Sequence, residues 1–322
     1  MHLPESSEKT TGLELEGQPM REGDKYYFTD GFSPRRGLLG ILAFPLAFKG
    51  QDAEYTMFYT TFDGRWPHRK LDFECRSVTY LDGNPKGSWF LLGKEGEIAE
   101  VGGAGRQERI SDAGIGRGKF GYLSGLASVD GTLFACGDSR QVYQRGPDGK
   151  WQHIDGGVLF REAQLDAGFK ALDGTASDNL YAVGSGGEIW HYNGNRWKQC
   201  ESPTHMNLHE VRCLRKDLVY ACGQAGIVLR GCLDQWEVLE VQGEAWEFWG
   251  VDALQDIVFV AGDGGIAVVR GNRIEAIDPG IGRKISGHRL RAGDGLLWSI
   301  GHDDILMFDG ARWTEIVRPD NL

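Results

Sequence analysis

The chain repeats itself, and this repeat constrains the possible fold more than any other feature. Its clearest copy covers residues 169–200: a short apolar strand, an LYAVG run, a glycine-rich turn, a second strand, an Asn-Gly turn and a Trp. The same pattern recurs around six glycines spaced 39 to 47 residues apart: Gly93, Gly137, Gly184, Gly223, Gly262 and Gly301. A period near 40 built from short strands and turns is typical of a β-propeller.

Each copy predicts four antiparallel strands, which together form one blade. In the clearest copy we expect strands over residues 169–172, 180–184 and 188–192, and a fourth that begins at Trp197. The second strand is a nearly continuous apolar run in every copy, as expected where neighbouring blades cover both faces. Asp-Gly and Asn-Gly pairs separate the last two strands of three copies, and such pairs are strong hairpin signals.

The number of blades depends on the residues before Cys75. Residues 55–66 match a third strand, an Asp63-Gly64 turn and a Trp that begins a fourth strand, while residues 25–30 and 40–48 supply the first two. We therefore predict an all-β fold with seven blades, with a six-bladed ring as the alternative. Residues 1–20 form a polar N-terminal segment, and residues 21–322 form a single domain. The final copy ends in a complete strand over residues 313–317, so packing between blades is expected to close the ring.

The charge balance limits the classes of partner. The 322 residues carry a formal net charge of −11, which argues against a nucleic-acid surface and permits a basic protein partner. The start of the chain lacks a signal-peptide pattern, and the longest apolar stretch, residues 37–48, is too short to span a membrane. We expect a cytoplasmic monomer with no membrane contact.

The six cysteines are scattered singly, without the spacing of a zinc site. Cys136 and Cys222 precede the repeat glycine, where other copies have apolar residues, so both are expected in the core. The glycine-rich turns lie between strands and no helix follows them, which argues against a nucleotide site. We predict neither a metal nor a cofactor.

The repeat resembles a family of bacterial β-propellers whose copies read roughly W..V.......YAVG..G.I.HY.G..W, matched best by residues 169–200 and 286–317. Its Asp-Gly-x-Trp turns also resemble degenerate Asp-box hairpins of sialidases and related propellers. The WD40 signature is missing, since no Trp-Asp pair closes a fourth strand. These resemblances imply a fold and not an activity.

Residues that differ between copies mark a candidate binding face, because packing constrains only the residues that repeat. In propellers, ligands usually bind where the first strand of each blade begins, around the central channel. At that position the copies diverge, and the next position adds two charged residues; the candidates are Arg76, Ser124, Lys170, His209, Trp249 and His288, with Glu210 and Arg289. The alternative is that these residues only fill or solvate the channel mouth.

A second candidate is the acidic, aromatic loop over residues 237–247, which contains Trp246. Tryptophans often dominate the energy of protein interfaces, so this loop is a plausible docking patch. The alternative is an ordinary solvated loop with its aromatic rings packed under the next blade.

No catalytic constellation emerges from the sequence. His209 and His288 lie two blades apart without an evident third ligand or orienting acid, apart from Glu210. The leading hypothesis is therefore a non-catalytic protein-binding module, in its narrower form an inhibitor or immunity-type protein that neutralises a basic toxin. The alternatives are an Asp-box-type glycan hydrolase or lyase that uses Arg76 and Arg289, and a lectin-like or assembly-factor propeller with a ligand at the channel mouth.

Overall fold

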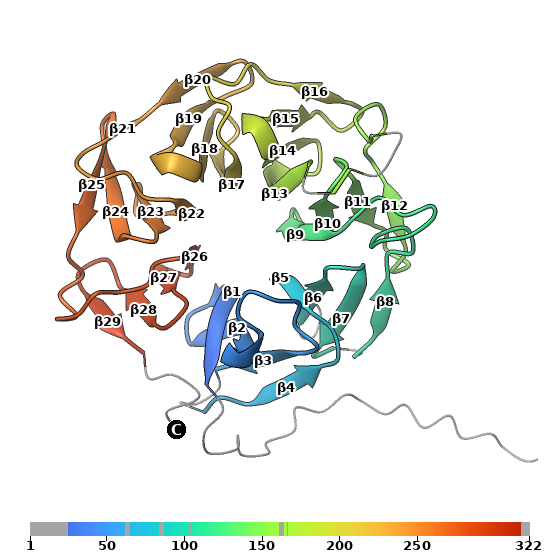
Figure 1. The fold of residues 1–322 in the computed structure, drawn as a ribbon, viewed down its shortest axis with the longest axis horizontal. Helices are drawn as coiled ribbons and strands as arrows, with labels where there is room; N and C mark the ends of the chain where they lie inside the picture. Colours follow the sequence, from blue (N-terminus) through green and yellow to red (C-terminus); the bar gives the residue numbers. More distant parts are fainter. Residues whose placement is uncertain are drawn as a thin grey trace, which may run out of the picture.

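The chain forms a ring of seven four-stranded antiparallel sheets (Figure 1). The computed structural model describes residues 25–61, 65–83, 87–103, 105–160, 164–165 and 167–316. Within these residues the seven sheets confirm the all-β, seven-bladed prediction over the six-bladed alternative. The predicted polar segment, residues 1–20, and the Asp63-Gly64 turn lie outside the described residues.

Each of blades 1 to 4 is a meander whose first strand lies at the centre of the ring. Their strands are β1 (Tyr26–Arg35), β2 (Leu38–Pro45), β3 (Thr56–Thr60) and β4 (His68–Leu71); β5 (Cys75–Leu81), β6 (Ser88–Gly93), β7 (Glu97–Val101) and β8 (Gln107–Arg109); β9 (Leu123–Val129), β10 (Thr132–Gly137), β11 (Val142–Arg145) and β12 (Trp151–His153); β13 (Phe169–Ala176), β14 (Asn179–Gly184), β15 (Ile189–Tyr192) and β16 (Trp197–Gln199).

Blades 5 to 7 continue in the same way, and one of them gains a strand. Their strands are β17 (Leu208–Arg215), β18 (Leu218–Gly223), β19 (Val228–Cys232) and β20 (Gln235–Val238); β22 (Phe248–Leu254), β23 (Ile257–Gly262), β24 (Gly265–Arg270) and β25 (Arg273–Ile277); β26 (Arg289–Gly293), β27 (Leu296–Ile300), β28 (Ile305–Phe308) and β29 (Trp313–Glu315). The extra strand, β21 (Glu240–Val241), leaves blade 5 and pairs in parallel with β25 of blade 6.

The described part of the chain also contains three short 3-10 turns: η1 (Leu46–Phe48), η2 (Ser185–Gly187) and η3 (Gln224–Gly226). The first of them corrects the predicted strand over residues 40–48, because β2 ends at Pro45 and the chain then turns. Proline has no N–H to donate to a strand ladder, so it is a natural end point. None of these helical segments of the described chain is a candidate membrane span.

The core lies between the blades rather than inside them. In blade 4 the central strand β14 is buried on both faces, as its apolar run predicts. One typical cluster joins Phe134 of blade 3 to Phe169 and Trp197 of blade 4. Cys136 and Cys222 are fully buried in such clusters, which confirms that they are core residues, and burial raises the pKa of the Cys136 thiol to about 12.

Packing between the first and last blades closes the ring, as predicted. All four strands of blade 1 come from the start of the described chain and all four of blade 7 from its end. Ile41 of β2 packs with Trp298 and Ile300 of β27 in one cluster. A backbone hydrogen bond also joins blades 1 and 7, since the Phe28 N–H donates to the carbonyl of His302 at 3.0 Å.

A buried ion network joins the inner strands of blades 1, 5 and 7. Arg291 donates to Glu210 Oε2 at 3.1 Å and to Asp30 Oδ1 at 3.0 Å, and Arg289 donates to the same Glu210 oxygen at 2.9 Å. The partners lie as many as 261 residues apart in the chain. Burial costs these charges their hydration, so the pairs and their additional hydrogen bonds must offset that loss.

Two further aspartates extend this network to the inner strands of blades 4 and 6. Arg212 of β17 donates to Asp252 at 3.0 Å and lies 3.5 Å from Asp173. Each aspartate also accepts a backbone N–H from the next blade: Asp173 from Cys213 at 2.8 Å, and Asp252 from Ala292 at 2.7 Å. Burial raises the pKa of Asp173, while Arg212 acts in the opposite direction.

Replacing Arg291 by Met tests whether this network stabilises the ring. The substitution keeps most of the side-chain volume but leaves Asp30 without its closest cation and Glu210 with Arg289 alone. Breaking a buried pair costs about 3 kcal/mol, so we expect a loss of that order in the free energy of unfolding, measured by urea titration. The matched control is Arg215→Met, whose guanidinium is exposed and pairs only with Asp217. Equal stability of the two variants would contradict a structural role for the network.

Candidate functional site

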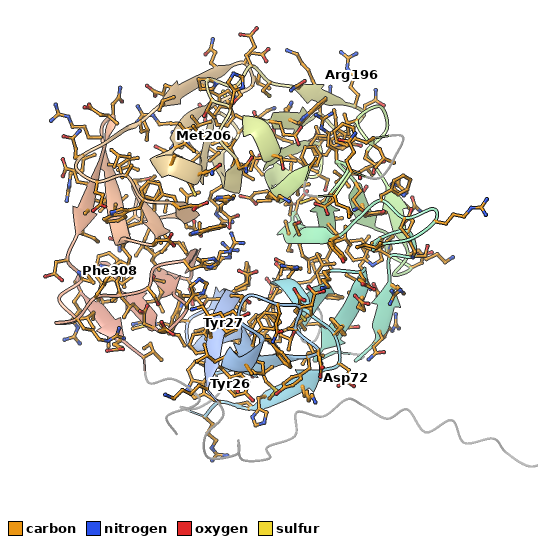
Figure 2. The ribbon with its side chains drawn as sticks, in the orientation of Figure 1. Tyr26, Tyr27, Asp72, Arg196, Met206 and Phe308 are labelled. Carbon is orange, nitrogen blue, oxygen red and sulfur yellow. The ribbon has the colours of Figure 1, made fainter. Side chains whose placement is uncertain are left out.

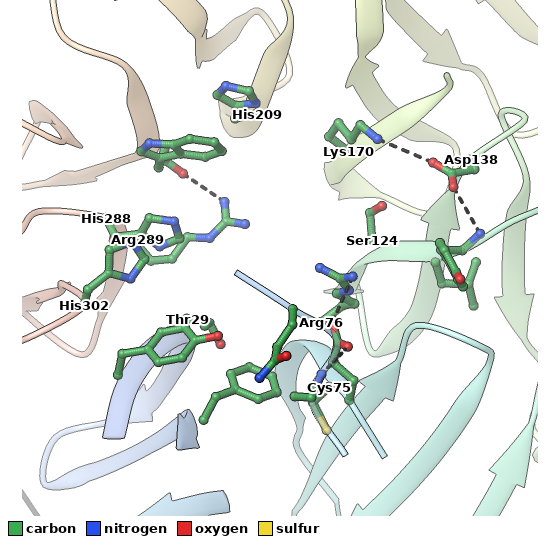
Figure 3. Close-up of a pocket in the computed structure, with 18 residues that line it drawn as sticks. Thr29, Cys75, Arg76, Ser124, Asp138, Lys170, His209, His288, Arg289 and His302 are labelled. Carbon is green, nitrogen blue, oxygen red and sulfur yellow. Dashed lines mark hydrogen bonds and ion pairs between the residues drawn. The ribbon is translucent and has the colours of Figure 1, made fainter. Parts of the chain in front are cut away.

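A pocket of about 490 Å³ opens where the inner strands begin. Seven of the predicted residues line it: Arg76, Ser124, Lys170, His209, Trp249, His288 and Arg289 (Figure 3). Thr29 of β1 also lines it and is the blade 1 member of the same column. The sequence did not reveal Thr29, because blade 1 is the most degenerate copy.

β-Bulges explain why this column points into the pocket. In β5 the pairing register shifts between Cys75 and Ser77, so Arg76 has no partner in the ladder. The same shift leaves Lys170 of β13, His209 of β17 and Trp249 of β22 unpaired. A bulge turns its extra residue out of the regular alternation. The scaffold thus repeats one device that presents a different side chain from each of these blades.

One wall of the pocket is an arc of stacked rings. The Trp249 indole stacks on His209 with ring centroids 4.0 Å apart and on His288 at 5.4 Å. His302 continues the arc at 4.6 Å from His288 and meets Tyr27 edge-on at 6.1 Å. Tyr27 faces the pocket while its neighbour Tyr26 packs in the core, as expected for successive strand residues (Figure 2).

Two of the three histidines of this wall, His209 and His288, have pKa values below the ordinary one. Burial lowers the pKa of His288 well below its ordinary value, and the nearby Arg289 adds to the effect. Burial also lowers the pKa of His209, although its Nε2 lies 2.9 Å from Glu247 Oε1. The arc is therefore an aromatic surface rather than a positively charged one.

The other walls carry cations held by acids. Arg76 pairs with Glu74 at 2.8 Å, and the same carboxylate pairs with Lys94 at 2.9 Å. Lys170 lies 3.4 Å from Asp138, whose other oxygen accepts the Tyr122 N–H. Asp138 and His302 each follow a repeat glycine, Gly137 and Gly301. This shared turn position is the sequence signal that marks both residues as candidates.

Two predicted residues lie away from the pocket. Glu210 is buried in the ion network beneath it, because it follows the bulged His209 and its side chain points to the channel. Trp246 is half-buried and packs on the core between blades 5 and 6, in contact with Phe248 at 6.0 Å. This packing favours the alternative to the docking patch, with the ring packed under the blade, and a docking role of Trp246 stays a prediction.

The described residues that line the pocket provide only part of the arrangement that the enzyme hypothesis uses. His209 and His288 each stack on Trp249, with ring centroids 4.0 and 5.4 Å from it. Arg76 and Arg289 are the arginines among the described lining residues, whereas a sialidase-type site requires a triad. Within the described ranges, no group of three or more His, Cys, Asp or Glu side chains is placed to hold a metal ion.

Four large apolar side chains are exposed on the loops around the pocket. They are Ile115 between β8 and β9, Leu165 between β12 and β13, Met206 between β16 and β17, and Leu46 between β2 and β3, with 57%, 47%, 45% and 42% of each residue exposed. The same loops on blades 1 and 2 contribute Gln51, Ala53 and Tyr122 to the pocket lining. Single exposed apolar residues are common on protein surfaces, and these four share the end of the ring at which the pocket opens.

The sequence comparison identifies a relative of this chain. Over 248 residues it is 35% identical to the immune protein Tsi7 of Pseudomonas aeruginosa, a match that covers 76% of this chain and 81% of that protein. The chain belongs to the Tsi7 family. This membership confirms the hypothesis of an immunity-type protein and supports a protein as its partner. No protein-family model matches the chain, so its place in a particular bacterial repeat family stays a prediction.

Solved structures support the fold. The chain is similar to YCF48 bound to a D1 peptide, with a TM-score of 0.64 at 15% identity over 94% of this chain and 98% of that one. It is also similar to the WD40 propeller domain of Doa1, with a TM-score of 0.60 at 12% identity over 91% of this chain and 93% of that one. At these identities the similarity concerns the propeller alone.

A charged clip holds the loop between blades 2 and 3. His153 of β12 bonds through Nδ1 to Asp155 at 2.8 Å and through Nε2 to Asp112 of the loop. Tyr143 donates to Asp112 at 3.0 Å, and Gln141 donates to loop carbonyls, including that of Gly121 at 3.0 Å. The clip thereby fixes the loop that carries Ile115 and Tyr122.

The clip predicts a pH dependence of stability. The hydrogen bond with Asp155, followed by that with Asp112, raises the pKa of His153 to about 9. A histidine whose pKa is raised on folding contributes stability that is complete below its ordinary pKa of 6.5 and is lost as pH rises through about 9. Because the side chain is 37% exposed, we expect about 1 kcal/mol after solvent screening.

The measurement compares wild type with His153→Gln by thermal unfolding. The wild type should be more stable at pH 6, and the difference between the two proteins should shrink towards pH 10. A difference that stays constant across this range would exclude a protonated His153 as the origin of the stabilisation.

Proposed function

We propose that the chain is a non-catalytic immunity protein that binds a protein toxin with its pocket face. The observation that carries the proposal is the coincidence of three features on one face: a pocket, a bulged residue from each of several blades, and exposed apolar side chains on the loops of the same end, here called the rim. Membership of the Tsi7 family supports the immunity role. Burial of apolar anchors at the centre of a contact is the usual source of affinity.

The charge of the chain supports a toxin with a basic surface. A net charge of −11 speeds encounter with a basic protein and slows encounter with an acidic one. Glu240 and Glu244 are exposed on the loop between blades 5 and 6, whereas Glu237 pairs with Arg230. The proposal places the inhibitor in the cytoplasm as a monomer, so that a single chain binds the toxin through its pocket face.

The rim can be tested with matched apolar-to-aspartate variants. The tagged chain is used to isolate its partner from its own cells, and the purified partner is then titrated by calorimetry. We expect the double variant Leu165→Asp/Met206→Asp to weaken binding by at least about tenfold, because it places charge at two apolar anchors.

The control is Ile257→Asp, because Ile257 is 43% exposed but lies in the β22–β23 hairpin, which connects the strands at the opposite end from the pocket. It should leave affinity within about twofold. The partner should also arrest growth when produced alone and cease to do so when the wild-type chain is present. Undiminished binding by the rim variant, or a partner that is harmless to cells, would contradict the proposed function.

A further inference from the structure

Three cationic side chains from three separate blades surround the pocket. Arg76 comes from blade 2, Lys170 from blade 4 and Arg289 from blade 7, and they occupy three sides of the opening (Figure 3). Each cation has one acid beside it: Glu74 and Asp138 line the pocket with Arg76 and Lys170, and Glu210 lies beneath it and is shared by Arg289 and Arg291. Three cations around one opening are unexpected in a chain with a net charge of −11.

Arg76 and Lys170 use only some of their N–H donors in the pairs with Glu74 and Asp138. Arg76 uses one terminal nitrogen in its pair with Glu74, although a guanidinium has five N–H donors. Its side chain is 43% exposed towards the pocket, and Glu74 is shared with Lys94. Lys170 makes one long contact, at 3.4 Å, although an ammonium has three donors.

Two buried nitrogens beside the pocket also lack a hydrogen-bond partner among the described residues. Arg289 directs Nη1 to Glu210 and to the Trp249 carbonyl, but its Nε makes no hydrogen bond and lies 4.0 Å from the nearest Asp30 oxygen. The Nδ1 atom of His288 is likewise buried and unpaired. A buried N–H without a partner is costly, and the Nε–H of Arg289 is such a donor, while Nδ1 of His288 is a donor in one of its two tautomers.

We propose that the pocket binds a carboxylate of the partner protein between Arg76, Lys170 and Arg289. This inference rests on the proposed function, since it specifies which group of the toxin enters the pocket. A carboxylate accepts the parallel donors of a guanidinium, and partial burial strengthens the bond. The Trp249 arc then contacts the apolar part of the same peptide segment. A volume of about 490 Å³ accommodates the end of a peptide or one protruding turn.

Peptide titration tests this chemistry separately from toxin binding. The probes are acetyl-Gly-Gly-Phe-Asp-amide, its Asn counterpart, and Gly-Gly-Phe-Ala with either a free or an amidated C-terminus. Binding is followed by the indole N–H resonance of Trp249, assigned from its loss in Trp249→Phe; this N–H donates to Asp263 at 3.2 Å. Inorganic phosphate is a fifth probe.

We expect at least one carboxylate peptide to shift this resonance and its amide partner to bind at least about tenfold more weakly, as for the loss of a charge-assisted bond. Which pair differs tells an acidic side chain from a chain terminus. Arg76→Gln and Lys170→Gln should each weaken the carboxylate peptide to a similar degree. Both variants should fold, because Glu74 keeps Lys94 and Asp138 keeps the Tyr122 N–H. Arg215→Gln, on an exposed residue paired with Asp217, is the matched control and should change nothing.

Equal binding of carboxylate and amide peptides, binding of neither, indifference to both variants, or tighter binding of phosphate would each overturn the inference. Its failure differs from failure of the proposed function. A toxin that still depends on Leu165 and Met206 but not on Arg76 or Lys170 would disprove the carboxylate site and leave the immunity role intact. If the carboxylate peptides bind as expected but no toxin is found, the carboxylate site stands and the immunity role is contradicted.

Discussion

The ion network in the central channel is the interaction on which the site depends. The inner strands of a propeller converge, and here Asp30, Glu210 and Arg291 connect three of them across the axis. Because Glu210 is shared between two arginines, it also fixes Arg289, whose side chain lines the pocket above. The floor of the pocket is thus part of the structure that joins the blades. Its geometry is set before any ligand arrives, which lowers the entropic cost of binding.

Because of the bulge at the start of most inner strands, one residue is free to contact a ligand while its neighbours keep the pairing and packing of the blade. Residues on either side of it, such as Cys75 and Val78 in blade 2, pair and pack in the repeating way. The bulged residue, here Arg76, is released from the ladder and from the core. Its identity can change without loss of packing, which is why the copies disagree at this position while their neighbours agree.

This separation also explains how far the sequence could predict the structure. The blades followed from their period and apolar runs, which are local signals, and the bulged column was visible as divergence within a regular repeat. Glu210 was misplaced because it lies one residue beyond the bulge, where the side chain points to the channel. Its partners Arg289 and Arg291 lie 79 and 81 residues away, and nothing local marks such pairs. Asp138 and His302 were missed because turn residues vary for many reasons.

The two signs of charge in this protein act over different distances. The net charge of −11 is felt across the solvent, where salt screens it over about 8 Å, and therefore acts mainly on the rate of encounter. The cations of the pocket are partly shielded from solvent and act only on a group that enters it. Under the proposed function, a partner is selected twice, first for a basic surface that is attracted and then for a single acidic group placed to reach Arg76 and Lys170. An acidic protein would be repelled before it reached the pocket, and a basic one without that group would bind without its anchor. Such opposed requirements reject most proteins that meet only one of them, which is how specificity is obtained from modest contacts.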